Sequence, residues 1–215
     1  MITFPVSWPY GRRMPCWDQA LITAAIRGEL WPMPVRFEEV DGPIDAGVVI
    51  ASGSLCAAEG PIELPRGWCL LVHTSDESQQ WDSEGLRRPG LKIWRQYTTD
   101  ATADRSLCVG WPPETRDILR DIPRRPLSER RKWAFIGQVQ NEERVRLIED
   151  LKDRTDGDLL VTAGFGTGLA RPDYLARLAG AAAVFCPAGN VHEDTFRRYE
   201  ACEAGCWPIK YIGQI

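Results

Sequence analysis

The stretch that sets the fold is Ala181-Ala-Ala-Val-Phe-Cys-Pro-Ala-Gly-Asn-Val-His-Glu-Asp-Thr-Phe-Arg-Arg-Tyr-Glu-Ala-Cys-Glu-Ala-Gly-Cys-Trp-Pro208. Its opening run, closed by Pro187, is short and apolar, which predicts a buried parallel strand. The polar residues that follow supply capping groups, and they predict a helix from Thr195 to Ala204 that Gly205 stops. A strand that leads through a polar loop to a helix start presents free backbone N–H groups and the positive end of the helix dipole. This arrangement suits a diphosphate.

The alternation of strand and helix extends over the C-terminal part of the chain. Apolar runs predict strands at 132–136, 159–162, 181–186 and 207–212, and intervening runs predict helices at 142–152, 172–178 and 195–204. Repeated β-α units imply a parallel sheet with helices on both faces. Ligands of such sheets bind outside the carboxyl ends of the strands, where Gly137, the loop 163–168 and the loop 187–194 are expected.

A second α/β block precedes this one. Strands are predicted at 2–4, 35–37, 47–51, 68–73, 91–97 and 106–109, and helices at 16–27 and 77–83. Residues 121–131 are rich in charge and proline and poor in apolar side chains, which is typical of a linker. The sequence therefore predicts an N-terminal Rossmann-like lobe at 1–121, a linker at 122–131 and a C-terminal lobe at 132–215.

Three segments resemble the exostosin-like glycosyltransferases, which have the GT-B fold. The C-terminal segment matches the donor-site motif of that family at Gly189, Asp194-Thr-Phe-Arg197, Glu200-Ala201, Glu203-Ala-Gly-Cys206 and Pro208. The segment Val72-His-Thr-Ser-Asp-Glu77 is similar to the family's His-x-Ser-Asp-Glu segment. Arg130-Arg-Lys-Trp-Ala-Phe-Ile-Gly137 is similar to the strand that opens the family's donor domain. Three apolar replacements stand within the C-terminal motif, at Cys202, Trp207 and Ile209.

The resemblance implies two Rossmann-like lobes in a GT-B-like arrangement, shortened at both ends. It implies a glycosyltransferase, hexosyl- or pentosyl-transferring and metal-independent, that moves a sugar from a nucleotide diphosphate sugar to a hydroxyl of a glycan, protein or other acceptor. No cofactor besides this substrate is expected. Arg197 and the helix start would neutralise the leaving diphosphate, and Glu200 would accept the ribose hydroxyls. The implied donor-binding residues are Gly137, Arg144, Gly164, Gly166, Asn190, His192, Asp194, Thr195, Phe196, Arg197 and Glu200.

A general base is expected after the strand 68–73. His73, Asp76 or Glu77 would activate the acceptor if the reaction inverts the anomeric centre. The segment also has a structural explanation, because Thr74-x-x-Glu77 has the form of a capping box. The chain is shorter than members of the family, so an alternative function is a non-catalytic module that binds a nucleotide or a glycan.

Other motifs favour neither a cofactor nor a metal. Gly164-x-Gly166-x-Gly168 follows a strand but lacks the third glycine at the spacing of a dinucleotide site and the acidic residue that would hold ribose. Asp156-Gly-Asp158 imitates a metal-binding Asp-x-Asp, yet it precedes its strand, where Asp-Gly is turn chemistry. The seven cysteines have no Cys-x-x-Cys spacing and only two histidines accompany them, so neither a zinc site nor a disulfide framework is expected.

The absence of a visible targeting segment separates the chain from the membrane-anchored Golgi members of the family it resembles, and it predicts a bacterial or viral protein in the cytoplasm. A formal net charge of −4 argues against bulk binding of nucleic acid. Residues 1–10 lack the basic start and apolar core of a signal peptide, and no apolar run is long enough to cross a bilayer. Most tryptophans, Trp207 among them, are better explained by packing, and Trp81 and Trp111, beside polar or proline-rich turns, are the candidates for a sugar platform.

Overall fold

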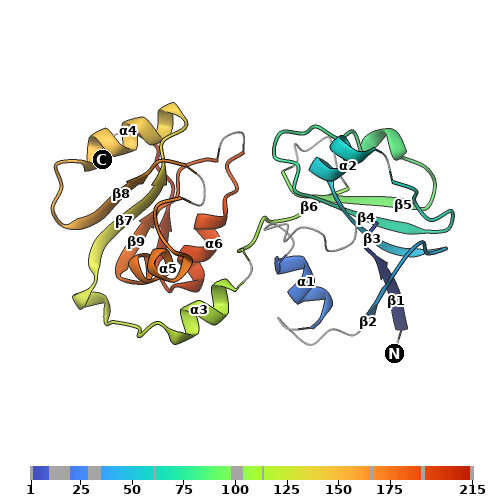
Figure 1. Ribbon diagram of the computed structural model, residues 1–215, viewed down its shortest axis with the longest axis horizontal. Helices are drawn as coiled ribbons and strands as arrows, with labels where there is room; N and C mark the ends of the chain where they lie inside the picture. The colour runs from blue at the N-terminus through green and yellow to red at the C-terminus, as the bar shows by residue number, and fades with distance from the viewer. Residues whose placement is uncertain are drawn as a thin grey trace. The chain divides into compact units, whose positions relative to one another are not determined.

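The computed structural model of the chain is an α/β protein of two compact units, Met1–Pro112 and Pro113–Ile215 (Figure 1). It describes residues 2–9, 20–28, 35–60, 62–97, 104–112, 114–164, 167–189 and 192–213. Each unit has its own sheet, and every strand pair in both sheets is parallel. The predicted α/β class with two Rossmann-like parallel sheets is therefore confirmed.

The first unit contains a six-stranded sheet in the order β2-β1-β3-β4-β5-β6. Its strands are β1 (Ile2–Ser7), β2 (Val35–Val40), β3 (Gly47–Ser52), β4 (Cys69–Thr74), β5 (Leu91–Arg95) and β6 (Arg105–Ser106). Its described helices are α1 (Ala20–Ile26), α2 (Gly53–Glu59) and the 3-10 helix η2 (Glu84–Leu86). β2 lies on one side of β1 and all later strands on the other, so the strand order reverses between β1 and β3.

The strands predicted for this unit overlap the observed ones, but the helix predicted at 77–83 is wrong. The chain turns there, with Gln79 in the left-handed region at φ 52°. The Asp76 carboxylate accepts the backbone N–H groups of Gln80 at 2.7 Å and Trp81 at 3.2 Å, which competes with helix formation. α2 was not predicted, although Ser52 caps its start by accepting the N–H of Leu55. The predicted helix 16–27 overlaps α1, and its residues 16–19 lie outside the described part of the chain.

The second unit contains a four-stranded sheet in the order β10-β9-β7-β8. Its strands are β7 (Arg131–Gln138), β8 (Gly157–Thr162), β9 (Ala181–Phe185) and β10 (Trp207–Ile209). Its helices are α3 (Thr115–Asp121), α4 (Glu142–Leu151), α5 (Arg171–Ala179), α6 (Phe196–Glu203) and the 3-10 helix η3 (Leu127–Glu129). One hydrophobic cluster joins α3, α5 and α6 to one face of the sheet, and another joins α4 to the opposite face. Helices on both faces were predicted, and the structure confirms them (Figure 1).

The second unit begins earlier than the predicted C-terminal lobe. Contacts divide the chain between Pro112 and Pro113, and α3 packs on α5 and α6 through the buried side chain of Leu119. The stretch 122–131, predicted as a linker, therefore belongs to this unit. Its charged composition suggests a solvent-exposed linker, but one of these charges binds the rest of the unit. The Arg130 guanidinium donates to the carbonyls of Arg125 and Gly205, both at 2.9 Å.

Gly157 opens β8 beside the buried indole of Trp133, and a Cβ at this position would lie 2.0 Å from Trp133 Cε2. Because the indole is enclosed, we expect Gly157→Ala to lower the free energy of unfolding by about 1–3 kcal/mol. Gly180→Ala is the matched control, since its Cβ would meet no atom nearer than 3.4 Å. Urea denaturation measures both variants, and equal unfolding midpoints would contradict this account of the packing.

Candidate functional site

The carboxyl edge of the second sheet carries the candidate site. The strand order reverses between β7 and β9, which is the position where open α/β sheets form a ligand crevice. Pairing between these strands runs only to Ala134 and Val184, although β7 continues to Gln138. The last residues of β7 lie beyond this pairing, and a side chain of α6 contacts them.

That side chain is Arg197, in the first turn of α6. Its Nη2 donates to the carbonyl oxygen of Ile136 at 2.9 Å, and its Cζ lies 5.0 Å from the centre of the Phe135 ring. A Cβ on Gly137 would lie 2.2 Å from the same Nη2. The structure thus brings the predicted residues Gly137 and Arg197 together. It also gives the reason for the glycine, because any larger residue would displace the guanidinium.

Two polar atoms at the start of α6 are buried without a hydrogen-bond partner among the described residues. They are Nε of Arg197 itself and the hydroxyl of Thr195. Thr195 occupies the N-cap position of α6, but its hydroxyl accepts no backbone N–H of the helix. The start of α6 therefore offers an uncommitted hydroxyl next to a fixed guanidinium.

The predicted residues Asp194 and His192 precede this turn and contact each other. The N–H of Asp194 donates to His192 Nδ1 at 3.4 Å. The Asp194 carboxylate accepts the hydroxyl of Tyr199 at 2.8 and 3.0 Å, which joins the loop to α6. The predicted Phe196 is half-buried at the first position of that helix. These contacts tie the end of the loop to α6.

Arg144, predicted to contact the donor, instead anchors the loop that follows β9. It is buried, and its guanidinium donates to the carbonyl of Ala188 at 2.9 and 3.2 Å and to that of Gln138 at 3.3 Å. The neighbouring Glu143 accepts the N–H of Ala188 at 3.3 Å, and Asn141 donates to the carbonyl of Gly189 at 2.9 Å. These bonds to backbone carbonyls give Arg144 a role in positioning the loop.

Glu200 also departs from its predicted role. Its residue exposure is 2%, and its carboxylate accepts hydrogen bonds from Arg171 and, at 2.6 Å, from the hydroxyl of Tyr174. Arg171 donates as well to Thr115 Oγ1 at 2.7 Å. Burial, and then the charge of Glu200, raise the pKa of Tyr174 well above its ordinary value. A ribose would have to displace Tyr174 to reach this carboxylate, so the structure assigns Glu200 to joining α5 and α6.

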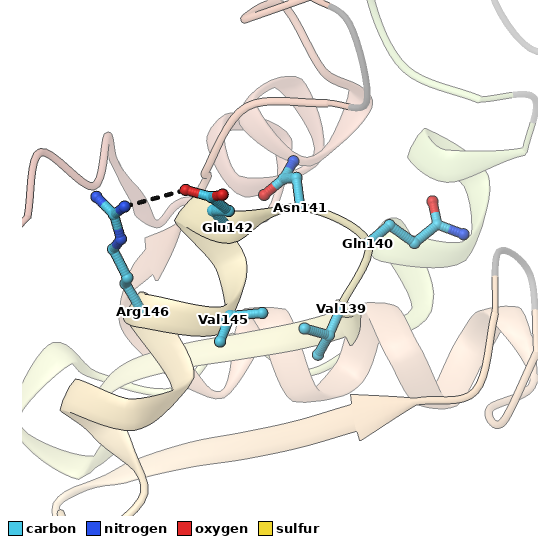
Figure 2. A pocket seen from close by; sticks show the side chains of 6 residues that line it. All are labelled: Val139, Gln140, Asn141, Glu142, Val145 and Arg146. Carbon is cyan, nitrogen blue, oxygen red and sulfur yellow. Dashed lines mark hydrogen bonds and ion pairs between the residues drawn. The ribbon is translucent and has the colours of Figure 1, made fainter.

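Of the remaining predicted donor residues, the structure describes Gly164. Gly164 follows β8 in a turn closed by the N–H of Thr167, which donates to the carbonyl of Gly164 at 3.3 Å. Gly166 and Asn190 lie outside the described residues. At the start of α4 a shallow cavity of about 540 Å³ is lined by Val139, Gln140, Asn141, Glu142, Val145 and Arg146 (Figure 2). None of these lining residues was predicted.

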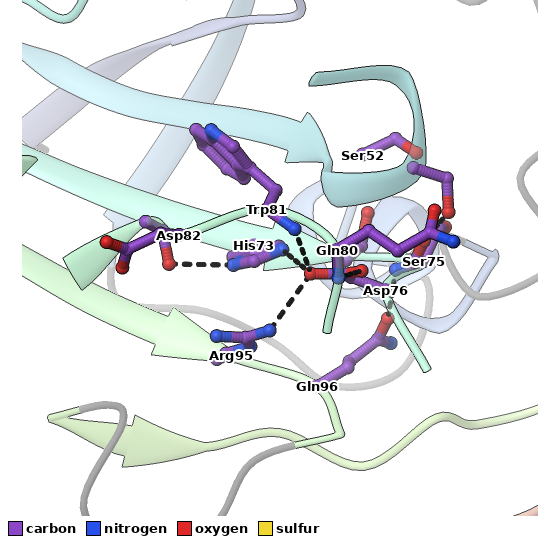
Figure 3. Close-up of polar contacts among 12 residues, drawn as sticks. Ser52, His73, Ser75, Asp76, Gln80, Trp81, Asp82, Arg95 and Gln96 are labelled. Carbon is purple, nitrogen blue, oxygen red and sulfur yellow. Dashed lines mark hydrogen bonds and ion pairs between the residues drawn. The ribbon is translucent and has the colours of Figure 1, made fainter. Parts of the chain in front are cut away.

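Two of the residues predicted as general bases, His73 and Asp76, belong to a buried cluster in the first unit (Figure 3). His73 has no exposed surface, and its Nδ1 lies 2.8 Å from Ser83 Oγ and its Nε2 3.1 Å from Asp76 Oδ2. Arg95 Nη2 donates to the same Asp76 oxygen at 2.9 Å. A Cβ on Gly53 would lie 2.2 Å from His73 Nε2, so the cluster also depends on that glycine.

Electrostatics keep this cluster as a neutral histidine beside an ionised carboxylate. Burial lowers the pKa of His73, and the hydrogen bond to Asp76 opposes the shift without reversing it. Burial alone would raise the pKa of Asp76, but hydrogen bonds from His73 and from the backbone of Gln80 and Trp81 lower it overall. The imidazole lies between the Ser83 hydroxyl on the Nδ1 side and the Asp76 carboxylate on the Nε2 side.

The order Ser83, His73, Asp76 is that of a nucleophilic triad, but Ser83 has no exposed surface and no substrate reaches its hydroxyl. His73 and Asp76, two of the three predicted general bases, are therefore closed to solvent in this structure. The capping box is wrong, because no helix follows Thr74 and its hydroxyl donates to the carbonyl of Ala51 at 3.3 Å. Glu77 is half-buried, and it alone of the three retains an accessible side chain.

Sequence reasoning missed Arg95, Ser83, Arg171 and Tyr174. A signal existed for Arg95, because the alternation Leu91, Ile93, Arg95 places it on a buried face of β5, where a charge requires a partner. Among the tryptophans, Trp81 packs edge-on against His73 at 4.7 Å and is buried, so its expected role as a sugar platform is wrong. Trp207 is 73% exposed instead of packed, because it lies on the edge strand β10.

Comparison with known proteins yields no match: no protein-family model fits the chain, and no curated protein is significantly similar to it. Within the described ranges no group of three or more His, Cys, Asp or Glu side chains is placed to hold a metal ion. Asp156 of the Asp-Gly-Asp motif instead accepts the indole N–H of Trp133 at 2.8 Å, which lowers its pKa to about 2. No described helix is long and apolar enough to span a membrane.

The His73 cluster predicts a pH dependence of stability. The pKa of His73 in the folded protein lies below its unfolded value of about 6.5, so the unfolded chain binds the proton more readily. Acidification therefore favours unfolding. We expect the urea midpoint to fall as the pH drops from neutral to about 5, a window in which Asp76 stays ionised. His73→Gln should flatten this dependence. An unchanged slope in that variant would remove His73 as the cause.

Proposed function

We propose that the second unit binds a nucleoside diphosphate sugar and that the chain transfers the sugar to an acceptor hydroxyl, as its resemblance to the exostosin-like glycosyltransferases of the GT-B fold implies. The observation that supports this proposal most directly is the Arg197 guanidinium beside Gly137 at the reversal of the strand order. A fixed cation at the carboxyl edge of a parallel sheet suits the diphosphate group of such a donor.

Three groups of the α6 start would bind the diphosphate together. Arg197 supplies the charge, Thr195 supplies a hydroxyl that has no other partner among the described residues, and the first N–H groups of α6 add the positive end of its dipole. Because Ile136 and Phe135 already hold the guanidinium, little reorganisation accompanies the departure of the diphosphate. This account needs no metal ion.

The geometry changes two parts of the mechanism implied by the resemblance. Glu200 orients α6 through Arg171 and Tyr174 in place of a direct ribose contact. Glu77 is the base that we retain, since His73 and Asp76 are buried and bonded to each other. If the reaction inverts the anomeric centre, Glu77 accepts the proton of the acceptor hydroxyl.

The burial of His73 and Asp76 favours a second candidate function, a module that binds the nucleotide or a glycan without catalysis. The two functions share the Arg197 site and differ in turnover. Slow hydrolysis of the donor, or transfer, distinguishes them. The cytoplasmic location expected from the sequence stays a prediction for either function.

Calorimetry with UDP, ADP and GDP tests the donor site. We expect at least one of them to bind, and we expect Arg197→Gln to weaken binding by about 1.5–3 kcal/mol through loss of charged hydrogen bonds. Arg198→Gln is the matched control, because this neighbouring arginine of α6 makes none of the described contacts with β7. Absence of binding by all three nucleotides at about millimolar concentration would refute the proposal.

Chelation tests the metal-independent account. Binding of the nucleotide, and any donor hydrolysis, should be the same with EDTA as without it, because Arg197 and the α6 start carry the countercharge. Binding that disappears with EDTA and returns with Mn²⁺ or Mg²⁺ would show that a divalent cation supplies this charge instead.

Turnover tests the role of Glu77. If it is the base, Glu77→Gln should reduce hydrolysis or transfer about 10²-fold or more while nucleotide affinity stays unchanged. The matched variant is Glu63→Gln, an exposed glutamate elsewhere in the first unit. Full activity in Glu77→Gln would exclude this residue as the base, and intact nucleotide binding with no turnover in the wild type would favour the binding module.

A further inference from the structure

A second feature of the second unit is a patch of arginines and exposed apolar side chains at the amino ends of β7 and β10. We call it the basic patch, and its members are Arg124, Arg125, Leu127, Arg130, Arg131 and Trp207. Leu127 is 57% exposed and Trp207 73% exposed. Among the described residues no carboxylate forms an ion pair with any of the four arginines, whereas nearby Lys132 and Arg154 both pair with Asp156.

Hydrogen bonds hold the patch in one place. The N–H of Arg130 donates to the carbonyl of Leu127 at 3.2 Å, and its side chain donates to the carbonyls of Arg125 and Gly205. Arg124 Nη1 lies 3.8 Å from the position of a Cβ on Gly205. Gly205 is in the turn that leads to β10, so the segment 124–130 is fixed beside the start of that strand.

The strand register places Arg131 and Trp207 on the same face of the sheet. Arg131 pairs with Ala181, and Trp207 pairs with Ala183 two residues further along β9. Paired residues, and residues two apart in a strand, point to the same face. Trp133 pairs with Ala183 as well and packs against α4, so this is the α4 face, and Trp207 lies on a part of it that α4 leaves open.

We propose that the basic patch docks on the surface of an anionic phospholipid membrane. The exposed guanidinium groups of Arg124, Arg125 and Arg131 complement the headgroup phosphates. The exposed indole and leucine of the patch match the boundary between headgroups and acyl chains. Glu129 and Asp121, both exposed, reduce the local charge but leave an excess of arginine. The chain as a whole has a formal net charge of −4, so the attraction is confined to this surface.

The apolar members favour lipid over nucleic acid. Single-stranded nucleic acid binds aromatic side chains that stack on its bases along a basic groove. Leu127 has no stacking surface, and it is half-exposed on the short helix η3 among arginines. An aliphatic side chain in this position gains free energy by leaving water for the acyl region.

Co-sedimentation with phosphatidylcholine vesicles, with and without phosphatidylserine, tests the proposal. We expect the full chain to bind vesicles that contain phosphatidylserine and to remain in the supernatant with phosphatidylcholine alone. The double variant Arg124→Gln and Arg131→Gln should lower the partition coefficient about tenfold or more, and Trp207→Ser about fivefold. No binding to the anionic vesicles at low salt, or binding that neither variant changes, would overturn the proposal.

Matched controls lie outside the patch. Arg66→Gln removes an exposed arginine of the first unit, and Ile212→Ser removes an apolar side chain that is 88% exposed, and both should bind vesicles as the wild type does. Fluorescence anisotropy with a single-stranded oligonucleotide provides the competing outcome. Oligonucleotide binding that the arginine variants abolish, without vesicle binding, would assign the patch to nucleic acid and refute the membrane proposal.

Discussion

The second unit depends on the contact between the Arg197 guanidinium and Gly137. The guanidinium lies against Gly137 and the Phe135 ring, and its bond to the carbonyl of Ile136 ties α6 to the last residues of β7. The absence of a side chain at residue 137 makes this possible. The same arginine therefore links α6 to β7 and provides a positive charge at the carboxyl edge of the sheet. An anion that binds there would meet a guanidinium that the fold already holds in place.

In both units, charged residues that the sequence suggests as catalytic or ligand-binding groups form buried ion pairs that stabilise the fold. Asp76 binds Arg95 and His73 in the first unit, and Glu200 binds Arg171 in the second. Removal of one member of such a buried pair leaves an unpaired charge, which typically costs about 3–5 kcal/mol. Loss of activity in variants at these positions would reflect unfolding as readily as chemistry, and the half-buried Glu77 is therefore the more informative residue.

The fold could be predicted where local pattern decides it, and not where tertiary contacts do. Continuous apolar runs revealed β7 and β9, because parallel strands buried on both faces need them. The turn after β4 was mistaken for a helix, since nothing local shows that the Asp76 carboxylate takes up backbone N–H groups. In the site, the proximity of Gly137 and Arg197 could be expected because both follow predicted strands at the carboxyl edge of one parallel sheet. The partners of Glu200 come from α5, which lies outside the C-terminal motif, so the motif alone did not reveal them.

The bond between Arg171 and Thr115 bears on how the chain can be divided by protein engineering. Through it, α3 belongs to the same polar network as α5 and α6, although α3 precedes the proline-rich stretch that looks like a natural joint. A fragment cut at that stretch would lose the helix and uncover the surface on which Leu119 packs. The module that can be excised, labelled for spectroscopy or grafted onto another protein therefore starts at Pro113.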